Sequence, residues 1–152
     1  MLEEASPRDR AWAAALVRDN MDATYRRHGL AWDPARFAAD WAAGENYLLR
    51  CDGEAVGYLR LFHHAGRSYL QDLQVVAGRC GFGLGTQALE QAKVLVGGRG
   101  DDALRLKVFA DSPAVRLYRR HGFVELLHEP PLIGMECRLT HRGGHRRLGV
   151  TR

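Results

Sequence analysis

The stretch Val75–Leu89, VVAGRCGFGLGTQAL, decides the fold because an apolar run leads there into a glycine cluster and then into a helical pattern. Glycines occupy every second position at Gly81, Gly83 and Gly85, so no Cβ keeps a ligand away from the backbone. Apolar residues then recur at helical spacing: Leu84, Ala88, Leu89, Ala92, Leu95 and Val96. Because the N–H groups at a helix start carry about half a positive charge, the stretch predicts a phosphate or pyrophosphate site.

Two common phosphate-binding loops do not fit this stretch. A Walker loop needs Lys and Ser or Thr directly after its last glycine, whereas Thr86 and Gln87 follow Gly85. A dinucleotide fingerprint spaces its glycines as GxGxxG, and here the spacing is GxGxG. Asp101 and Asp102 follow at the distance of a ribose-binding acid, but they precede the next predicted strand instead of ending it. A nucleotide-binding protein of Rossmann type is therefore a minor alternative.

Two segments carry a resemblance to one family. The segment from Cys80, CGFGLGTQAL, resembles the Q/R-x-x-G-x-G/A loop with which the GCN5-related N-acetyltransferases (GNAT) bind the pyrophosphate of acetyl-coenzyme A, although Cys80 replaces Gln or Arg. Asp111–Phe123, DSPAVRLYRRHGF, resembles the family's signature N-x-x-A-x-x-L-Y-x-x-x-G-F, with Asp111 in place of Asn. Both signatures, in this order and about 30 residues apart, are far more specific than either alone.

The order of the predicted elements agrees with this resemblance. Cap and turn signals, glycines and apolar periodicity predict helices over 6–29, 33–44, 84–96 and 112–122, and strands over 47–50, 55–62, 69–76, 103–110, 123–127 and 132–139. The helix between the third and fourth strands is a crossover, which makes these two strands parallel neighbours. We expect an α/β protein with the GNAT fold: a mixed, mostly antiparallel sheet, splayed between two parallel strands and flanked by four helices.

The resemblance also implies where acetyl-CoA binds. In the family it wedges between the two parallel strands, and a bulge in the first of them turns backbone N–H groups toward the thioester. By position, these N–H groups belong to Leu73 and Val75. The cofactor-binding residues expected on this basis are Leu73, Val75, Cys80, Gly81, Phe82, Gly83, Leu84, Gly85, Thr86, Asp111 and Ala114.

Tyr118 is the predicted general acid. The tyrosine of this motif lies beside the coenzyme A sulfur in the family, and a phenol with a pKa of about 10 can protonate a leaving thiolate whose thiol has a pKa of about 8.5. The alternative is that Tyr118 only packs its helix against the sheet.

No general base is assigned. Gln71 stands where several family members have a glutamate, and glutamine cannot titrate. Asp72 is adjacent but points to the opposite face of a regular strand unless the bulge reorients it. His63 and His64 have a suitable intrinsic pKa, yet paired histidines near a turn are mostly surface residues. We expect Gln71 and Trp32 in the substrate site, with a core position as the alternative for Trp32.

Length and composition predict one domain over residues 1–140 and a basic tail over 141–152. The tail holds four of the 22 basic residues and no acid, so the rest of the chain balances 18 basic against 18 acidic residues. The three cysteines are far apart without a C-x-x-C pair, and we expect neither disulfides nor a metal site. No membrane-length apolar run or signal-peptide core is present, and a cytoplasmic location is expected.

Together these features predict an N-acetyltransferase that moves the acetyl group of acetyl-CoA directly to a primary amine, of a small molecule or of an N-terminal or lysine amine. The expected partner is this small-molecule or peptide acceptor, without nucleic acid or membrane, and a homodimer is compatible with the sequence. A non-catalytic acyl-CoA sensor is the alternative, because Gln71 replaces the family's glutamate.

Overall fold

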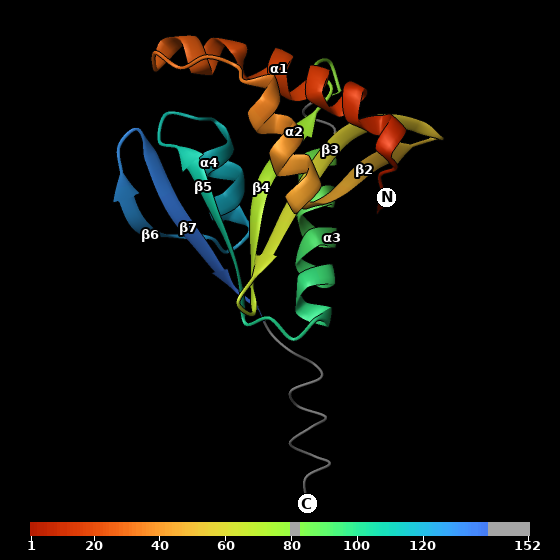
Figure 1. Cartoon of the computed structure of the whole chain (residues 1–152). Helices are drawn as coiled ribbons and strands as arrows, with labels where there is room; N and C mark the ends of the chain where they lie inside the picture. The colour runs from red at the N-terminus through yellow and green to blue at the C-terminus, as the bar shows by residue number, and fades with distance from the viewer. Residues whose placement is uncertain (80–82, 140–152) are drawn as a thin grey trace, which may run out of the picture. The chain divides into compact units, whose positions relative to one another are not determined.

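The computed structural model describes residues 1–79 and 83–139. Seven strands form one sheet in the order β1-β2-β3-β4-β5-β7-β6, in which β4 and β5 are a parallel pair (Figure 1). Its elements in chain order are β1 (Leu2–Glu4), the 3-10 turn η1 (Pro7–Asp9), α1 (Arg10–Arg27), α2 (Pro34–Ala43), β2 (Glu45–Cys51), β3 (Glu54–His64), β4 (Arg67–Val75), α3 (Leu84–Gly98), β5 (Ala103–Phe109), α4 (Ala114–Arg120), β6 (Val124–Glu129) and β7 (Leu132–Arg138). The expected mixed α/β fold with four helices is confirmed.

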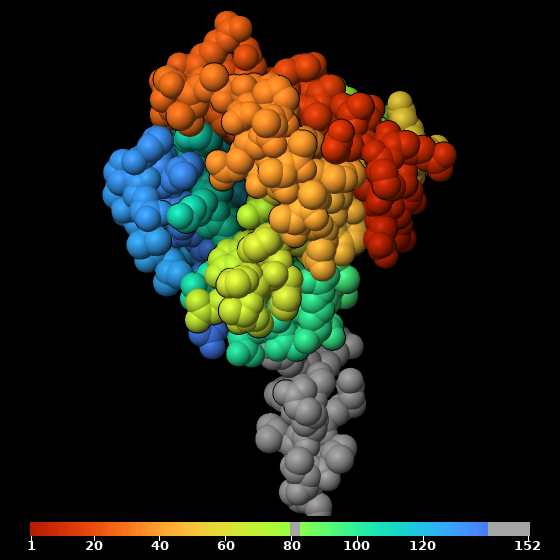
Figure 2. All heavy atoms as spheres, in the orientation of Figure 1, coloured from red at the N-terminus to blue at the C-terminus, as the bar shows by residue number. Residues whose placement is uncertain are grey.

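The first of two compact units comprises Met1–Phe62 and Gln71–Leu89. α2 begins where the sequence predicts it: the Asp33 carboxylate accepts from the N–H groups of Ala35 and Arg36 at 3.1 and 3.2 Å, and Pro34 opens the helix. The predicted helix start at Ser6–Pro7 instead forms the 3-10 turn η1, and α1 begins at Arg10. α1 and α2 lie against each other (Figure 2). The short strand β1, which pairs with β2, was not predicted because three residues carry too little periodicity to be recognised.

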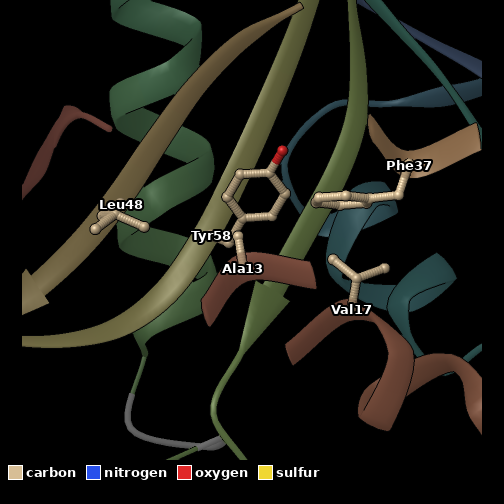
Figure 3. Packing of buried hydrophobic residues seen from close by; sticks show 5 residues of the cluster. All are labelled: Ala13, Val17, Phe37, Leu48 and Tyr58. Atoms are coloured by element: carbon tan, nitrogen blue, oxygen red, sulfur yellow. The ribbon is translucent and has the colours of Figure 1, made fainter. Parts of the chain in front are cut away.

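The core of this unit is an apolar cluster between the two helices and the sheet. Its buried members, drawn in Figure 3, are Ala13, Val17, Phe37, Leu48 and Tyr58. Trp32 and Trp41 pack against it, and the Phe37 ring lies 5.5 Å from Trp32 and 6.2 Å from Trp41 between ring centres. The ring centre of Tyr58 in β3 lies 6.1 Å from that of Phe37 and 5.8 Å from that of Trp41, and these contacts hold α2 against β3.

Tight two-residue turns set the pairing of β2 with β3 and of β3 with β4. Asp52–Gly53 has φ angles of 53° and 80°, and Ala65–Gly66 has 54° and 76°. Two successive positive φ values are typical of the hairpin turn that matches the strand twist, as the Asp-Gly pair predicts.

The second unit comprises His63–Leu70 and, of the residues that the structure describes, 90–139. Ser68–Leu70 of β4 pairs in parallel with Leu104–Leu106 of β5, and β7 pairs antiparallel with β5 and with β6. Its buried apolar residues include Leu70, Leu104, Leu106, Tyr118, Phe123, Ile133 and Met135. The edge strand β6 is exposed at every position.

Candidate active site

The start of α3 keeps the features expected of an anion site. Gly83 has a φ of 73°, and its carbonyl accepts the N–H of Gln87 at 2.9 Å. This is the bond that begins the helix, so the N–H groups of Leu84, Gly85 and Thr86 precede the helical hydrogen-bond pattern. Leu84 is buried, while Gly85 and Thr86 are partly exposed. The remaining predicted loop residues, Cys80, Gly81 and Phe82, lie outside the described residues.

Between the turn at Ala65–Gly66 and the hydrogen bond that joins Val56 to Val76, the chain of β4 is one residue longer than the chain of β3. The turn at Ala65–Gly66 places His64 opposite Arg67, and at the other end the N–H of Val76 donates to the carbonyl of Val56 at 2.8 Å. β3 takes eight steps from Val56 to His64, whereas β4 takes nine from Arg67 to Val76. Since antiparallel pairing advances both strands equally, β4 carries a β-bulge in this interval.

Arg60 places the bulge at Gln71 and Asp72. Counted from the turn, Arg60 faces Gln71, and counted from the Val56–Val76 bond it faces Asp72. Its guanidinium contacts both: Nη1 donates to Gln71 Oε1, and Nη2 donates to Asp72 Oδ2 at 2.7 Å. Two residues on one strand that oppose a single residue on the next are the mark of a bulge. Asp72 therefore does not point away from Gln71 as it would in a regular strand.

Arg60 is buried, with 6% of the residue exposed. Its Nη2 also lies 3.8 Å from Asp40 Oδ2 of α2. The aliphatic part of Arg60 passes over Gly44, where a Cβ would come within 3.0 Å of Arg60 Cδ. Within the described residues, Arg60 Nε is a buried donor without a partner. Burial of the Arg60 guanidinium, with one N–H group unpaired among the described residues, therefore costs folding free energy.

Burial and charge together set the ionisation of this cluster. Burial raises the pKa of Asp72, and the Arg60 guanidinium opposes this rise by stabilising the carboxylate. Burial also raises the pKa of Tyr25, with the negative charge of Asp72 as the second cause. Tyr58 donates to Asn46 Oδ1 at 2.6 Å, and burial raises its pKa too.

Asn20 of α1 holds the far end of β4. Its amide nitrogen donates to Gln74 Oε1 at 3.2 Å and to the Val75 carbonyl at 3.0 Å. Gln74 in turn donates to Asp72 Oδ1 at 3.3 Å. A chain of side chains therefore joins α1 through Gln74 and Asp72 to Arg60, and it fixes the segment that contains Leu73 and Val75.

In the second unit, Tyr118 is a buried residue of α4 whose ring centre lies 5.5 Å from that of Phe123, edge to face. α4 begins at Ala114, whose N–H donates to Ser112 Oγ at 3.1 Å. Asp111 precedes this turn and is exposed. The second signature thus forms one turn and helix, as expected.

The two histidines considered as general bases, His63 and His64, lie in different surroundings. His63 Nδ1 lies 3.1 Å from Ser68 Oγ and 3.4 Å from Asp101 Oδ2, while the Ser68 hydroxyl donates to Asp101 at 2.7 Å. Ser68 is fully buried and its proton is directed to Asp101, so this trio is not a nucleophilic triad. His64 is exposed.

Within the described part of the chain, no cluster of three or more His, Cys, Asp or Glu residues could hold a metal ion. Cys51 and Cys137 are free thiols. No helix in residues 1–79 and 83–139 is long and apolar enough to cross a membrane.

The sequence model described as the acetyltransferase (GNAT) family matches residues 13–123. The chain belongs to this family. The expected family and enzyme class, an acetyl-CoA-dependent N-acetyltransferase, are thereby confirmed. The search of curated proteins finds no match.

Solved structures of GNAT proteins share the fold. The ribosomal-protein-S18-alanine N-acetyltransferase of Escherichia coli is 20% identical, with a TM-score of 0.74 over 94% of this chain and 96% of that one. PaiA N-acetyltransferase of Thermoplasma acidophilum, solved with coenzyme A, is 15% identical, with a TM-score of 0.74 over 91% and 98%. Ard1 of Thermoplasma volcanium is 16% identical, with a TM-score of 0.72 over 93% and 98%.

Sequence reasoning missed Arg60 and Asn20. Arg60 lies in an apolar strand pattern, and one charged residue in a buried run was the available signal. Asn20 gave no such signal, because a polar residue on an amphipathic helix is usually solvated.

Proposed function

We propose that this acetyltransferase moves the acetyl group of acetyl-CoA directly to a primary amine, of a small molecule or of an N-terminal or lysine amine. One structural neighbour is named for an alanine of a ribosomal protein, so protein N-termini are included among the acceptors. The observation that carries the proposal is the bulge at Gln71–Asp72, because a bulge releases backbone groups from the ladder at the position where the reaction needs donors.

Residue roles follow the chemistry of acyl transfer. The thioester oxygen gains negative charge as the amine attacks, and we assign the N–H groups of Leu73 and Val75 to it. We assign the N-terminus of α3, at Gly83–Thr86, to the pyrophosphate, because its N–H groups and dipole favour an anion. We assign Tyr118 to protonation of the leaving thiolate. Gln71 and Trp32 are assigned to the acceptor.

Both signatures fall within a proposed catalytic domain of residues 1–140, with 141–152 as a basic tail outside it. We further propose a cytoplasmic enzyme, active as a monomer or a homodimer.

The experiment has two steps. The first compares the thermal stability of the protein with acetyl-CoA, NAD and ATP, and only acetyl-CoA should raise the melting temperature. The second measures release of free coenzyme A thiol with a panel of α-amino amides, peptides and alkylamines. Acetyl-CoA binding without thiol release above the rate of hydrolysis for any amine would indicate the acyl-CoA sensor instead. Stabilisation by NAD or ATP alone would refute both.

A further inference from the structure

We propose that Arg60 holds Gln71 as a hydrogen-bond donor toward the acceptor, and that Gln71 thereby selects amines with a carbonyl group on the carbon next to the amine. α-Amino amides and peptide N-termini have this chemistry, whereas polyamines and lysine side chains lack it. The inference rests on the proposed function, which places Gln71 in the acceptor site.

The contact with Arg60 fixes which way the Gln71 amide points. A guanidinium has five N–H donors and no acceptor, so only the amide oxygen of Gln71 can face Arg60 Nη1. The choice between amide oxygen and nitrogen, which is open for an isolated glutamine, is settled here by chemistry. The Gln71 NH2 group is consequently directed away from Arg60, on a residue that is exposed.

Arg60 is a rigid support for this amide. Its side chain is 7% exposed, its Nη2 is held by Asp72 at 2.7 Å, and its stem is confined by Gly44. A donor that is already oriented loses less entropy when a ligand binds, and therefore discriminates better between ligands. The buried, costly position of Arg60 is explained if this orientation is its role.

The charges around Gln71 balance one another. Asp72 is paired with Arg60, and Asp40 lies 3.8 Å from Arg60 Nη2 and 3.4 Å from Arg36 Nε, so two carboxylates face two guanidiniums. The cluster therefore offers no net charge by which to choose an amine, and the Gln71 NH2 group, which needs an oxygen as its partner, is left to discriminate between acceptors. An acceptor with a carbonyl next to its amine supplies this oxygen.

The spacing of Gln71 and Leu73 along β4 limits how far the carbonyl oxygen of the acceptor can be from its reacting amine. Gln71 is two residues before Leu73, and the bulge between them keeps their Cα atoms closer than the roughly 7 Å of a regular extended strand. If the thioester oxygen binds at the Leu73 N–H, the Gln71 donor lies within a few bonds of the reacting amine. The carbonyl of an α-amino amide fits this span, and the backbone carbonyl of a lysine residue is too far from its side-chain amine.

Selectivity between two matched acceptors tests the proposal. Alaninamide carries the carbonyl, and sec-butylamine replaces its carboxamide by an ethyl group. Values of kcat/KM are expressed per neutral amine, since an α-amino group has a pKa of about 7.7–8.0 and an alkylamine about 10.4. Gln71→Met keeps the length of the side chain without a donor, and it should lower the alaninamide to sec-butylamine ratio about 3- to 10-fold. Gln87→Met, in an exposed glutamine of α3, is the control and should keep the wild-type ratio.

Arg60→Lys tests the positioning role. A lysine ammonium has three donors but lacks the fixed, planar fork whose two nitrogens reach Gln71 and Asp72 separately, so it should orient Gln71 less firmly and the ratio should fall toward that of Gln71→Met. The double variant should show no further fall, because both changes remove the same interaction. An unchanged ratio in Gln71→Met, with both amines acetylated, would overturn the inference and leave the proposed function intact. Absence of coenzyme A release with every amine would instead overturn the proposed function and this inference with it.

Discussion

Arg60 of β3 and Asp72 of β4 form a buried ion pair, with 2.7 Å between Nη2 and Oδ2 and side chains only 7% and 11% exposed. The pair exists because the bulge brings Asp72 to the same side as Gln71. Removal of either partner would leave an uncompensated charge in the interior, whereas removal of both would not.

Arg60→Met should therefore destabilise the protein by about 3–5 kcal/mol near neutral pH, measured by urea unfolding. Without Arg60, burial loses its main opposition and raises the pKa of Asp72 further, although the hydrogen bond from Gln74 still opposes the rise. A carboxyl with a raised folded-state pKa binds its proton more tightly when folded, so its stability contribution is present below the unfolded pKa of about 3.9 and lost as pH rises through the folded value. The loss of unfolding free energy in Arg60→Met should accordingly shrink toward pH 4.

The double variant Arg60→Met with Asp72→Asn should be more stable than Arg60→Met at pH 7. An equally large loss of unfolding free energy in both variants would show that the charge pair is not the cause.

Gly57 is a second point at which the bulged strand can be probed. A Cβ on Gly57 would lie 2.8 Å from the backbone carbonyl oxygen of Gln74, closer than real side chains approach, and 3.3 Å from Leu49 Cβ. Because backbone must then move, Gly57→Ala should cost about 1–3 kcal/mol of unfolding free energy. Gly97→Ala in α3, where a Cβ meets no atom of residues 1–79 and 83–139 within 4 Å, is the control and should be neutral or stabilising. Equal stability of the two variants would contradict the close approach.

Gly83→Val should abolish acetyl-CoA binding, measured by calorimetry. Valine rarely adopts the φ of 73° that starts α3, and its side chain would project into the proposed pyrophosphate site. Gly29→Val provides the control, since Gly29 has a φ of 69° and, as at Gly83, no atom of the described residues lies within 4 Å of an added Cβ. Both variants carry backbone strain, but only the first should lose the ligand. Unchanged affinity in a folded Gly83→Val protein would refute the site.

Tyr118→Phe should lower turnover about 10²- to 10⁴-fold while acetyl-CoA affinity and folding barely change. The substitution removes one hydroxyl and keeps the ring contact with Phe123. Its effect should shrink with acetyl donors whose leaving thiol is more acidic, because such a thiolate departs without help. Wild-type turnover with saturating acetyl-CoA and a confirmed acceptor would make Tyr118 structural.

The rate should climb with pH toward the pKa of the acceptor amine, without an additional ionisation from the enzyme. This is expected because Gln71 cannot titrate and Asp72 is engaged by Arg60 and Gln74. A profile of kcat/KM against pH for an acceptor of known pKa provides the measurement. An ionisation near pH 6 that disappears in a His63 or His64 variant would assign the base to that histidine.

Local signals in the sequence predicted the fold well. Asp33–Pro34, Asp52–Gly53 and the glycines at 29, 83 and 122 act through backbone conformation within a few residues, and a sequence displays such effects directly. The two signatures likewise located α3 and α4.

The polar cluster of the site could not be predicted in this way. Arg60 and Asp72 are 12 residues apart, and their contact depends on one additional residue in β4, which shifts each following side chain to the other face. Asn20 and Val75 are 55 apart. The sequence pattern of a strand predicts that side chains alternate between the two faces of the sheet. Nothing in that pattern marks the residue at which a bulge interrupts the alternation.

The bonds from Asn20 to Gln74 and Val75 also have a consequence for motion. α1 cannot separate from the end of β4 without breaking both, so local opening of the helix and loosening of the strand should occur together. A ligand that orders β4 should then slow amide hydrogen exchange in the turn of α1 around Asn20, in a helix that the ligand itself need not touch.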